Sequence, residues 1–178
     1  MAYGRHINVF LRIRRYLLFM GLAGCGLIFI PDASVLRAEE PGDPLTIGRT
    51  VKIHSDALGE DRSVLVTTPA GYDQGARKYP VVYVLDGETN HLLSVAVTNF
   101  YWQNGLMPPV IVVSVTNTDR TRDFTPTAVA DRKGSGGGPK FMEFLKNELM
   151  PFVEKNYRTE PYRVLIGHSL CGMYAVWT

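Results

Sequence analysis

The chain has 178 residues, of which 46% are hydrophobic, and both values suit one folded domain with a packed core. Residues 1–38 carry five basic residues and one acidic residue, so the remaining 14 basic and 16 acidic residues have a net charge of −2. That balance gives no support to nucleic-acid binding. Of the two cysteines, Cys25 lies in the N-terminal segment and Cys171 alone remains beyond it, which excludes an intramolecular disulfide there.

The N-terminal segment has the pattern of a secretory signal. Arg12, Arg14 and Arg15 precede an apolar stretch from Tyr16 to Ile30, which is short for a membrane-spanning helix. A small residue, Ala38, then comes before a polar start. The pattern predicts a signal peptide over residues 1–38, cleavage after Ala38, and export of residues 39–178 to the periplasm or the extracellular space.

Two alternatives remain open for this segment. Leu22-Ala23-Gly24-Cys25 matches a lipoprotein box, which would place a lipid on Cys25 and anchor the protein to a membrane. An uncleaved anchor is the other alternative. In either case the membrane is reached only through the N-terminal segment.

The first half of the mature chain predicts strands that alternate with a helix. Two short β-rich segments come first, then two apolar runs that suit central parallel strands, with a segment of helical periodicity between them. These elements are Thr50–Ser55, Arg62–Thr68, Val81–Leu85, the helix His91–Gln103 and Val110–Val115.

A long loop, Thr116–Pro139, separates these elements from a second predicted helix, Lys140–Tyr157, and a third central strand, Arg163–Ile166. The helix presents one apolar face and contains Pro151, which predicts a kink. The inward-facing residues are Phe141, Leu145, Leu149 and Phe152. Strands that alternate with crossover helices predict an α/β fold: a mostly parallel sheet with helices on both faces.

The motif that carries chemistry follows the third central strand. Gly167-His168-Ser169-Leu170-Cys171 has the spacing of a nucleophile elbow, a tight strand-to-helix turn, with Cys171 where a second glycine is usual. Such a turn lifts a serine above the sheet edge in a strained backbone conformation. The amide of Leu170, at the start of the next helix, can then stabilise an oxyanion. Cysteine is small and apolar, so we expect Cys171 to be tolerated and buried.

Five segments, in chain order, carry a resemblance to a known family: Pro69–Tyr72, Tyr79–Gly87, Arg120–Pro126, Phe141–Tyr157 and Ile166–Leu170. They resemble the bacterial putative-esterase family, which includes esterase D, ferric-enterobactin-type, feruloyl and acetyl-xylan esterases and mycolyltransferases. The resemblance covers nearly all of residues 45–178. It implies an α/β-hydrolase fold and a serine carboxylic-ester hydrolase that acts through an acyl-enzyme.

The resemblance also implies roles for single residues. Ser169 corresponds to the nucleophile, and the amide of Leu170 to one oxyanion donor. The backbone of Gly87 or Glu88 corresponds to the second donor. The remaining candidates are Arg120, Arg122 and Asp123, which either bind substrate or form a structural, salt-bridged loop.

In this family the acid and the histidine of the catalytic triad follow the serine in the chain. Here His54, His91 and His168 all precede Ser169, and Thr178 ends the sequence. We therefore expect the N-terminal portion of a longer hydrolase, incomplete at its C-terminus, with an open sheet edge and weak or no ester hydrolysis.

Three hypotheses follow: an exported ester hydrolase, a non-catalytic or binding-only remnant, and an acyltransferase on the same fold. The expected partner is a small-molecule or carbohydrate-linked ester. The sequence contains no cluster of metal ligands, so no cofactor is implied.

Overall fold

The structure, a computed structural model, describes residues 42–178. The predicted signal peptide and Cys25 fall outside the described residues. Pro44–Thr178 forms one compact unit. Among residues 42–178, no helix has the length and apolar character needed to cross a membrane.

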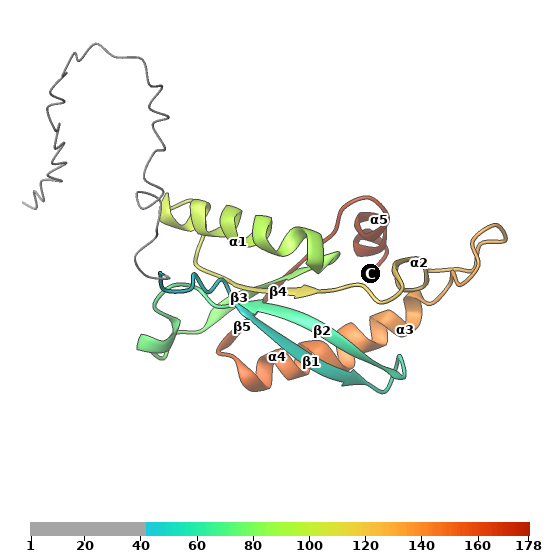
Figure 1. Ribbon diagram of the computed structural model, residues 1–178, viewed down its shortest axis with the longest axis horizontal. Coiled ribbons are helices and arrows are strands. Elements are labelled where there is room, and N and C mark those ends of the chain that lie inside the picture. The colour runs from blue at the N-terminus through green and yellow to red at the C-terminus, as the bar shows by residue number, and fades with distance from the viewer. Residues whose placement is uncertain (1–41) are drawn as a thin grey trace, which may run out of the picture. The chain divides into compact units, whose positions relative to one another are not determined.

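Five strands form one sheet in the order β1-β2-β4-β3-β5 (Figure 1). The strands are β1 (Arg49–Ser55), β2 (Glu60–Thr67), β3 (Tyr79–Val84), β4 (Ile111–Val115) and β5 (Thr159–Ile166). Strands β4, β3 and β5 are parallel, whereas β1 and β2 form an antiparallel hairpin that pairs with β4. The structure thus confirms the predicted α/β fold, and its three parallel strands end at the same edge.

Helices cover both faces of the sheet. Helix α1 (Gly87–Gln103) packs on one face, where Val82 and Val84 of β3 meet Val95 of the helix. The helical stretch that follows the long loop packs on the other face, against Tyr83 and its neighbours (Figure 1). Alternate residues of β3 therefore pack on opposite faces of the sheet. The apolar character of the whole strand predicts this arrangement.

The second predicted helix is one continuous helical stretch with an irregular middle. It comprises α3 (Gly138–Glu143), the π-helical η3 (Phe144–Leu149) and α4 (Met150–Asn156). The π turn lies just before Pro151, whose nitrogen cannot donate to the preceding turn, so the wider turn accommodates the proline. It also changes the helical phase: Val153 is fully buried, whereas the expected inward residue, Phe152, is only partly buried.

Two further boundaries differ from the sequence-based expectation. Helix α1 begins at Gly87 rather than His91, because the carbonyl of Asp86 accepts hydrogen bonds from the amides of Thr89 and Asn90. The long loop contains a short helix, α2 (Arg120–Asp123), which is capped by the Asp119 carboxylate at 2.9 Å from the Arg122 amide.

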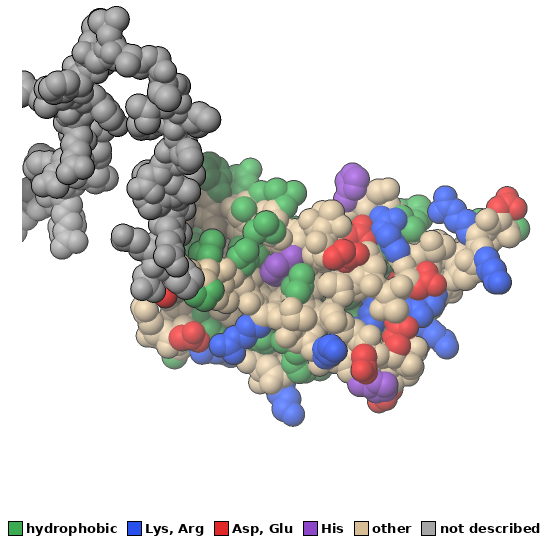
Figure 2. Space-filling view, in the orientation of Figure 1, with side chains coloured by type: hydrophobic (Ala, Val, Ile, Leu, Met, Phe, Trp, Pro, Cys, Tyr) green, Lys and Arg blue, Asp and Glu red, His purple; other side chains and the backbone are tan. Residues whose placement is uncertain are grey.

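The described sheet has an exposed edge at β5. Tyr162 and Ile166 of this strand are exposed. Apolar side chains also gather on the outer surface of α1, among them Leu92, Leu93 and Phe100 (Figure 2).

Candidate active site

The predicted nucleophile lies in the turn between β5 and α5 (Leu170–Trp177), with φ 59° and ψ −122°. Among the described non-glycine residues only Ser169 and Asp86 have a positive φ. A side chain with a Cβ rarely adopts such a conformation, and the strain is typical of functional sites. Ser169 is exposed at the carboxyl end of the sheet. The expected strained turn is therefore present.

The elbow is tight enough to require glycine beside the serine. A Cβ on Gly167 would lie 2.2 Å from the Cys171 carbonyl oxygen. Gly172 approaches the same segment, since its Cβ would lie 3.1 Å from the Gly167 oxygen. The first turn of α5 thus packs directly against the end of β5, which holds Ser169 in place.

The backbone amides expected as oxyanion donors lie at the starts of two helices. Leu170 is the first residue of α5, and Gly87 and Glu88 are the first two of α1. Amides in a first helical turn have no acceptor within their own helix. The preceding strands, β5 and β3, are adjacent and parallel, so both helices begin at one edge of the sheet. A Cβ on Gly87 would lie 2.8 Å from the Val115 oxygen, which explains the glycine.

Asp86 joins the elbow to the segment that follows β4. We call this set of residues the strand-end cluster: Asp86, Glu88, Asn117, Arg120 and Cys171. Arg120 binds the Asp86 carboxylate through Nε at 2.8 Å and Nη2 at 3.0 Å, and Asn117 Nδ2 donates to it at 2.8 Å. Burial acts to raise the pKa of Asp86, but the hydrogen bonds from Arg120, Cys171 and Asn117 outweigh it and lower the pKa. The carboxylate is therefore ionised and fully engaged.

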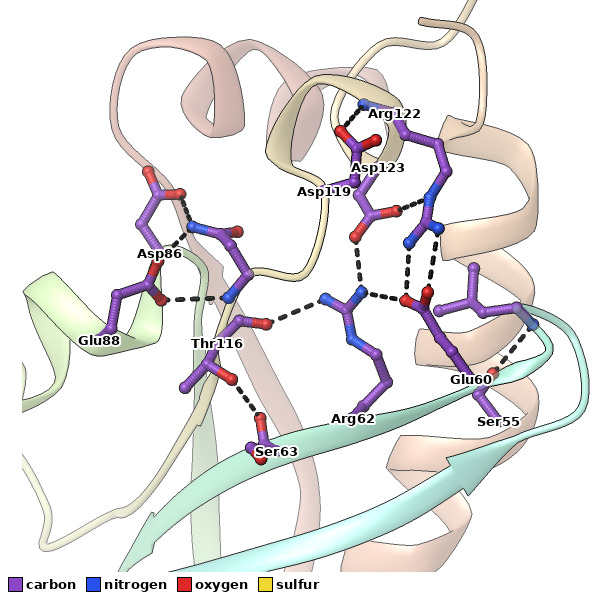
Figure 3. Close-up of polar contacts among 12 residues, drawn as sticks. Ser55, Glu60, Arg62, Ser63, Asp86, Glu88, Thr116, Asp119, Arg122 and Asp123 are labelled. Carbon is purple, nitrogen blue, oxygen red and sulfur yellow. Dashed lines mark hydrogen bonds and ion pairs between the residues drawn. The ribbon is translucent and has the colours of Figure 1, made fainter. Parts of the chain in front are cut away.

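Glu88 completes this cluster. Its carboxylate accepts hydrogen bonds from Asn117 Nδ2 at 2.6 Å and from the Asn117 amide at 3.1 Å. Figure 3 shows Asp86 and Glu88 facing the loop after Thr116. The first turn of α1, with its candidate amides, is thus fixed to the β4–α2 loop.

Cys171 is fully buried, as expected from its place in the motif. Its Sγ lies 3.1 Å from Asp86 Oδ2 and 3.0 Å from the His168 carbonyl, and it accepts from the His168 amide at 3.1 Å. Burial, followed by the bond to Asp86, raises the pKa of the thiol. The cysteine is therefore a neutral hydrogen-bonding group.

Arg122 and Asp123 belong to a second set of charges, the interior ion network: Glu60, Arg62, Arg122 and Asp123 (Figure 3). Arg62 and Asp123 are both fully buried and lie 2.7 Å apart. Arg122 binds Asp123 through Nε and Glu60 through both terminal nitrogens. These contacts favour the structural alternative for Arg122 and Asp123, whereas Arg120 lies in the strand-end cluster.

The three described histidines lie in different surroundings. His54 is exposed on the β1–β2 hairpin and contacts Asp61 at 2.7 Å. His91 lies between Thr67 Oγ1 at 3.0 Å and Ser114 Oγ at 2.7 Å, and burial lowers its pKa. His168 is exposed beside Ser169 in the elbow. His91 thus bonds to two hydroxyls of the sheet.

Across residues 42–178, no three His, Cys, Asp or Glu side chains come together in a group that could hold a metal ion.

A mixed sheet with helices on both faces, and a strained strand-to-helix turn at its carboxyl edge, defines an α/β-hydrolase fold. Residues 55–178 match the family described as "Putative esterase", and the chain belongs to that family. At the level of the family, this membership supports carboxylic-ester hydrolysis.

Two curated relatives come from Bacillus subtilis (strain 168). The uncharacterized protein YbbA is 24% identical over 131 residues, which are 69% of this chain and 52% of that protein. The ferri-bacillibactin esterase BesA is 29% identical over 119 residues, 55% of this chain and 41% of the relative. The chain therefore spans about half the length of the curated relatives it matches.

Solved structures agree with the fold. An IroE-like serine hydrolase from Shewanella oneidensis superposes with a TM-score of 0.68 at 34% identity, covering 71% of this chain and 44% of that one. The BES protein from Bacillus cereus gives a TM-score of 0.66 at 25% identity, covering 78% of this chain and 57% of its own.

Sequence reasoning assigned no role to Asp86 or Asn117. The available signal was an acidic residue directly after a buried strand, at the edge where sites of wound sheets form. Its partners could not be named, because Asp86 and Cys171 are 85 residues apart in the chain.

Proposed function

We propose that this chain carries the nucleophile and the oxyanion hole of a serine carboxylic-ester hydrolase that acts through an acyl-enzyme. Ser169 is the nucleophile, and the amides of Leu170 and of Gly87 or Glu88 are the donors. The observation that carries the proposal is the positive φ of the exposed Ser169 at the start of α5.

The geometry supports this chemistry in two ways. A carbonyl carbon attacked by Ser169 Oγ places its oxygen near the first turn of α5, where the Leu170 amide has no helical acceptor. The start of α1 contributes amides from the adjacent strand end. Two converging donors suit the negative charge of a tetrahedral intermediate, and one such donor is worth about 3 kcal/mol.

The substrate we propose is a small-molecule or carbohydrate-linked ester. The relative named as a ferri-bacillibactin esterase supports a small-molecule ester. Of the candidate substrate contacts, Arg120 lies in the strand-end cluster and keeps 38% of its side chain exposed. An acyltransferase on the same fold would use the same residues and differ only in the acceptor.

We also propose that the protein is exported. The basic Arg12–Arg15 segment and the apolar Tyr16–Ile30 stretch support a signal peptide. N-terminal sequencing of the protein from a bacterial host should find Glu39 or a residue close to it. An intact Met1 in a soluble cytoplasmic product would contradict export, and a lipid on Cys25 would favour the lipoprotein alternative.

The test of the proposed chemistry is covalent labelling of the purified chain with a fluorophosphonate, read by peptide mass spectrometry. Both ring nitrogens of His91 are engaged, by Thr67 and by Ser114. Added imidazole therefore supplies the base for this experiment. We expect imidazole-accelerated labelling on Ser169 and slow turnover of aryl esters. Ser169→Ala should lose both. Equal labelling of the two proteins would refute Ser169 as the nucleophile.

A further inference from the structure

Cys171 makes a bond that the usual glycine of the motif could not make. Its thiol has one hydrogen to donate and lies within reach of a carboxylate oxygen, Asp86 Oδ2, and a backbone oxygen, that of His168. The carboxylate is the stronger acceptor because it is charged. Cys171 Sγ also accepts from the His168 amide at 3.1 Å, so the thiol is held from the elbow side as well.

The thiol–carboxylate bond joins two places that matter for the proposed chemistry. Cys171 directly follows Leu170 in the first turn of α5, and Asp86 directly precedes Gly87 at the start of α1. Each end of the bond is therefore adjacent in the chain to a candidate oxyanion donor. The two donors come from parts of the sequence more than 80 residues apart, and this bond links them across the sheet edge.

The surrounding contacts make Asp86 a firm anchor. Arg120 holds both of its carboxylate oxygens, and Asn117 holds one of them. Asp86 also has φ 53°, in the left-handed region, so its backbone is fixed in a conformation that few residues adopt. The Arg120 guanidinium offsets a negative charge that would otherwise oppose an oxyanion nearby.

We propose that Cys171 and Asp86 are positioning residues whose thiol–carboxylate hydrogen bond fixes the amides of Leu170 and Gly87 relative to each other. That these amides serve an oxyanion rests on the proposed function. The geometric part, a mechanical link between the first turns of α5 and α1, stands on the contacts alone. Stabilisation of an oxyanion depends on donors preorganised at hydrogen-bond distance, so small displacements slow the reaction.

The experiment compares the full chain with Cys171→Ala, which removes the donor, and with Cys171→Ser, which restores one. The rate constant for fluorophosphonate labelling with imidazole should fall roughly tenfold in Cys171→Ala, with little change in the concentration needed for half-maximal rate. Cys171→Ser should recover most of the loss. Val153→Ala, a buried change in α4, is the control for general destabilisation and should label at the wild-type rate.

Equal labelling of Cys171→Ala and wild type would overturn the proposal while leaving Ser169 as the nucleophile. Failure of Cys171→Ser to recover the rate would also overturn it. If wild type labels no faster than Ser169→Ala, the proposed function is wrong, and backbone NMR relaxation decides the geometric part. Increased mobility at both Gly87 and Leu170 in Cys171→Ala, reversed in Cys171→Ser, would support the link, and unchanged mobility would refute it.

Discussion

The interior ion network and the strand-end cluster are built from the same kinds of residue, yet they differ in burial. The central pair of the interior ion network, Arg62 and Asp123, is 0% exposed, whereas Arg120 of the strand-end cluster keeps 38% of its side chain exposed. Arg122, at the outer end of the interior ion network, keeps 30%. Both sets take residues from the segment Asn117–Asp123, which includes α2 (Figure 3).

This difference in burial separates charged residues that stabilise the fold from charged residues that position the site. Arg62 lies under the rings of Phe141 and Phe144, 5.3 and 5.8 Å from their centroids, so water cannot replace a lost partner. Arg120 can be hydrated when Asp86 loses its charge. We therefore expect the interior ion network to control stability and the strand-end cluster to control the geometry around Ser169.

The largest expected effect comes from removing the buried carboxylate of the interior ion network. Asp123→Ala leaves Arg62 buried without its closest partner, and breaking such a pair costs about 3–5 kcal/mol. Urea denaturation followed by circular dichroism should report this loss in the free energy of unfolding. Asp131→Ala, an exposed aspartate in the long loop, is the matched control and should stay within about 0.5 kcal/mol of wild type. A similar small effect for Asp123→Ala would show that the network does not stabilise the fold.

A smaller effect, with a distinct pH dependence, is expected at Glu60. The hydrogen bond from Arg122, helped by Arg62, lowers the pKa of Glu60 to about 2 from 4.5. Because the pKa is lower in the folded state, the carboxylate contributes stability above pH 4.5 and loses this contribution as the pH falls through about 2.

Glu60→Gln should therefore cost about 2 kcal/mol at neutral pH, the range for a hydrogen bond to a charged group. The difference from wild type should shrink as the pH is lowered from 4.5 toward 2. Chemical denaturation of both proteins at several pH values measures this difference in the free energy of unfolding. A difference that stays constant over this range would mean that the carboxylate charge is not what Arg122 and Arg62 recognise.

The sequence predicts the central sheet well, because Val81–Leu85 and Val110–Val115 are apolar on both faces and therefore suit buried parallel strands. It also predicts the strained elbow at Ser169, since the motif is local. It misses the start of α1, because Asp86-Gly87 has the composition of a break, whereas the αL conformation of Asp86 begins a helix there.

Contacts between distant residues account for the other differences. Arg62 lies on the inward face of β2 with Val64 and Val66, where an apolar residue is expected. Its burial is explained by partners distant in the fold, Asp123 and the Thr116 carbonyl, together with Glu60. Val153 rather than Phe152 lies fully in the core because the π turn shifts the helical phase. A prediction based on the 3.6-residue period of a regular α-helix does not include that shift. In the same way, the partner of Cys171 comes from another strand end, so no local pattern indicates the bond to Asp86.

The smallest expected change in stability, and the sharpest test of the comparison, is Asp86→Asn. Asparagine accepts the left-handed backbone at this position and keeps the size of the side chain. The change removes the charge and turns one acceptor oxygen into an NH2 donor. Because Arg120 is partly exposed and can be hydrated, we expect a loss of only about 1 kcal/mol in the free energy of unfolding. Labelling of Ser169 should nevertheless slow markedly, since the amide oxygen is a weaker acceptor for the Cys171 thiol and Arg120 loses its ionic partner. Urea denaturation and fluorophosphonate labelling of the same sample separate the two effects. A loss of stability as large as that of Asp123→Ala, with labelling unchanged, would mean that the strand-end cluster supports the fold in the same way as the interior ion network and does not position the site.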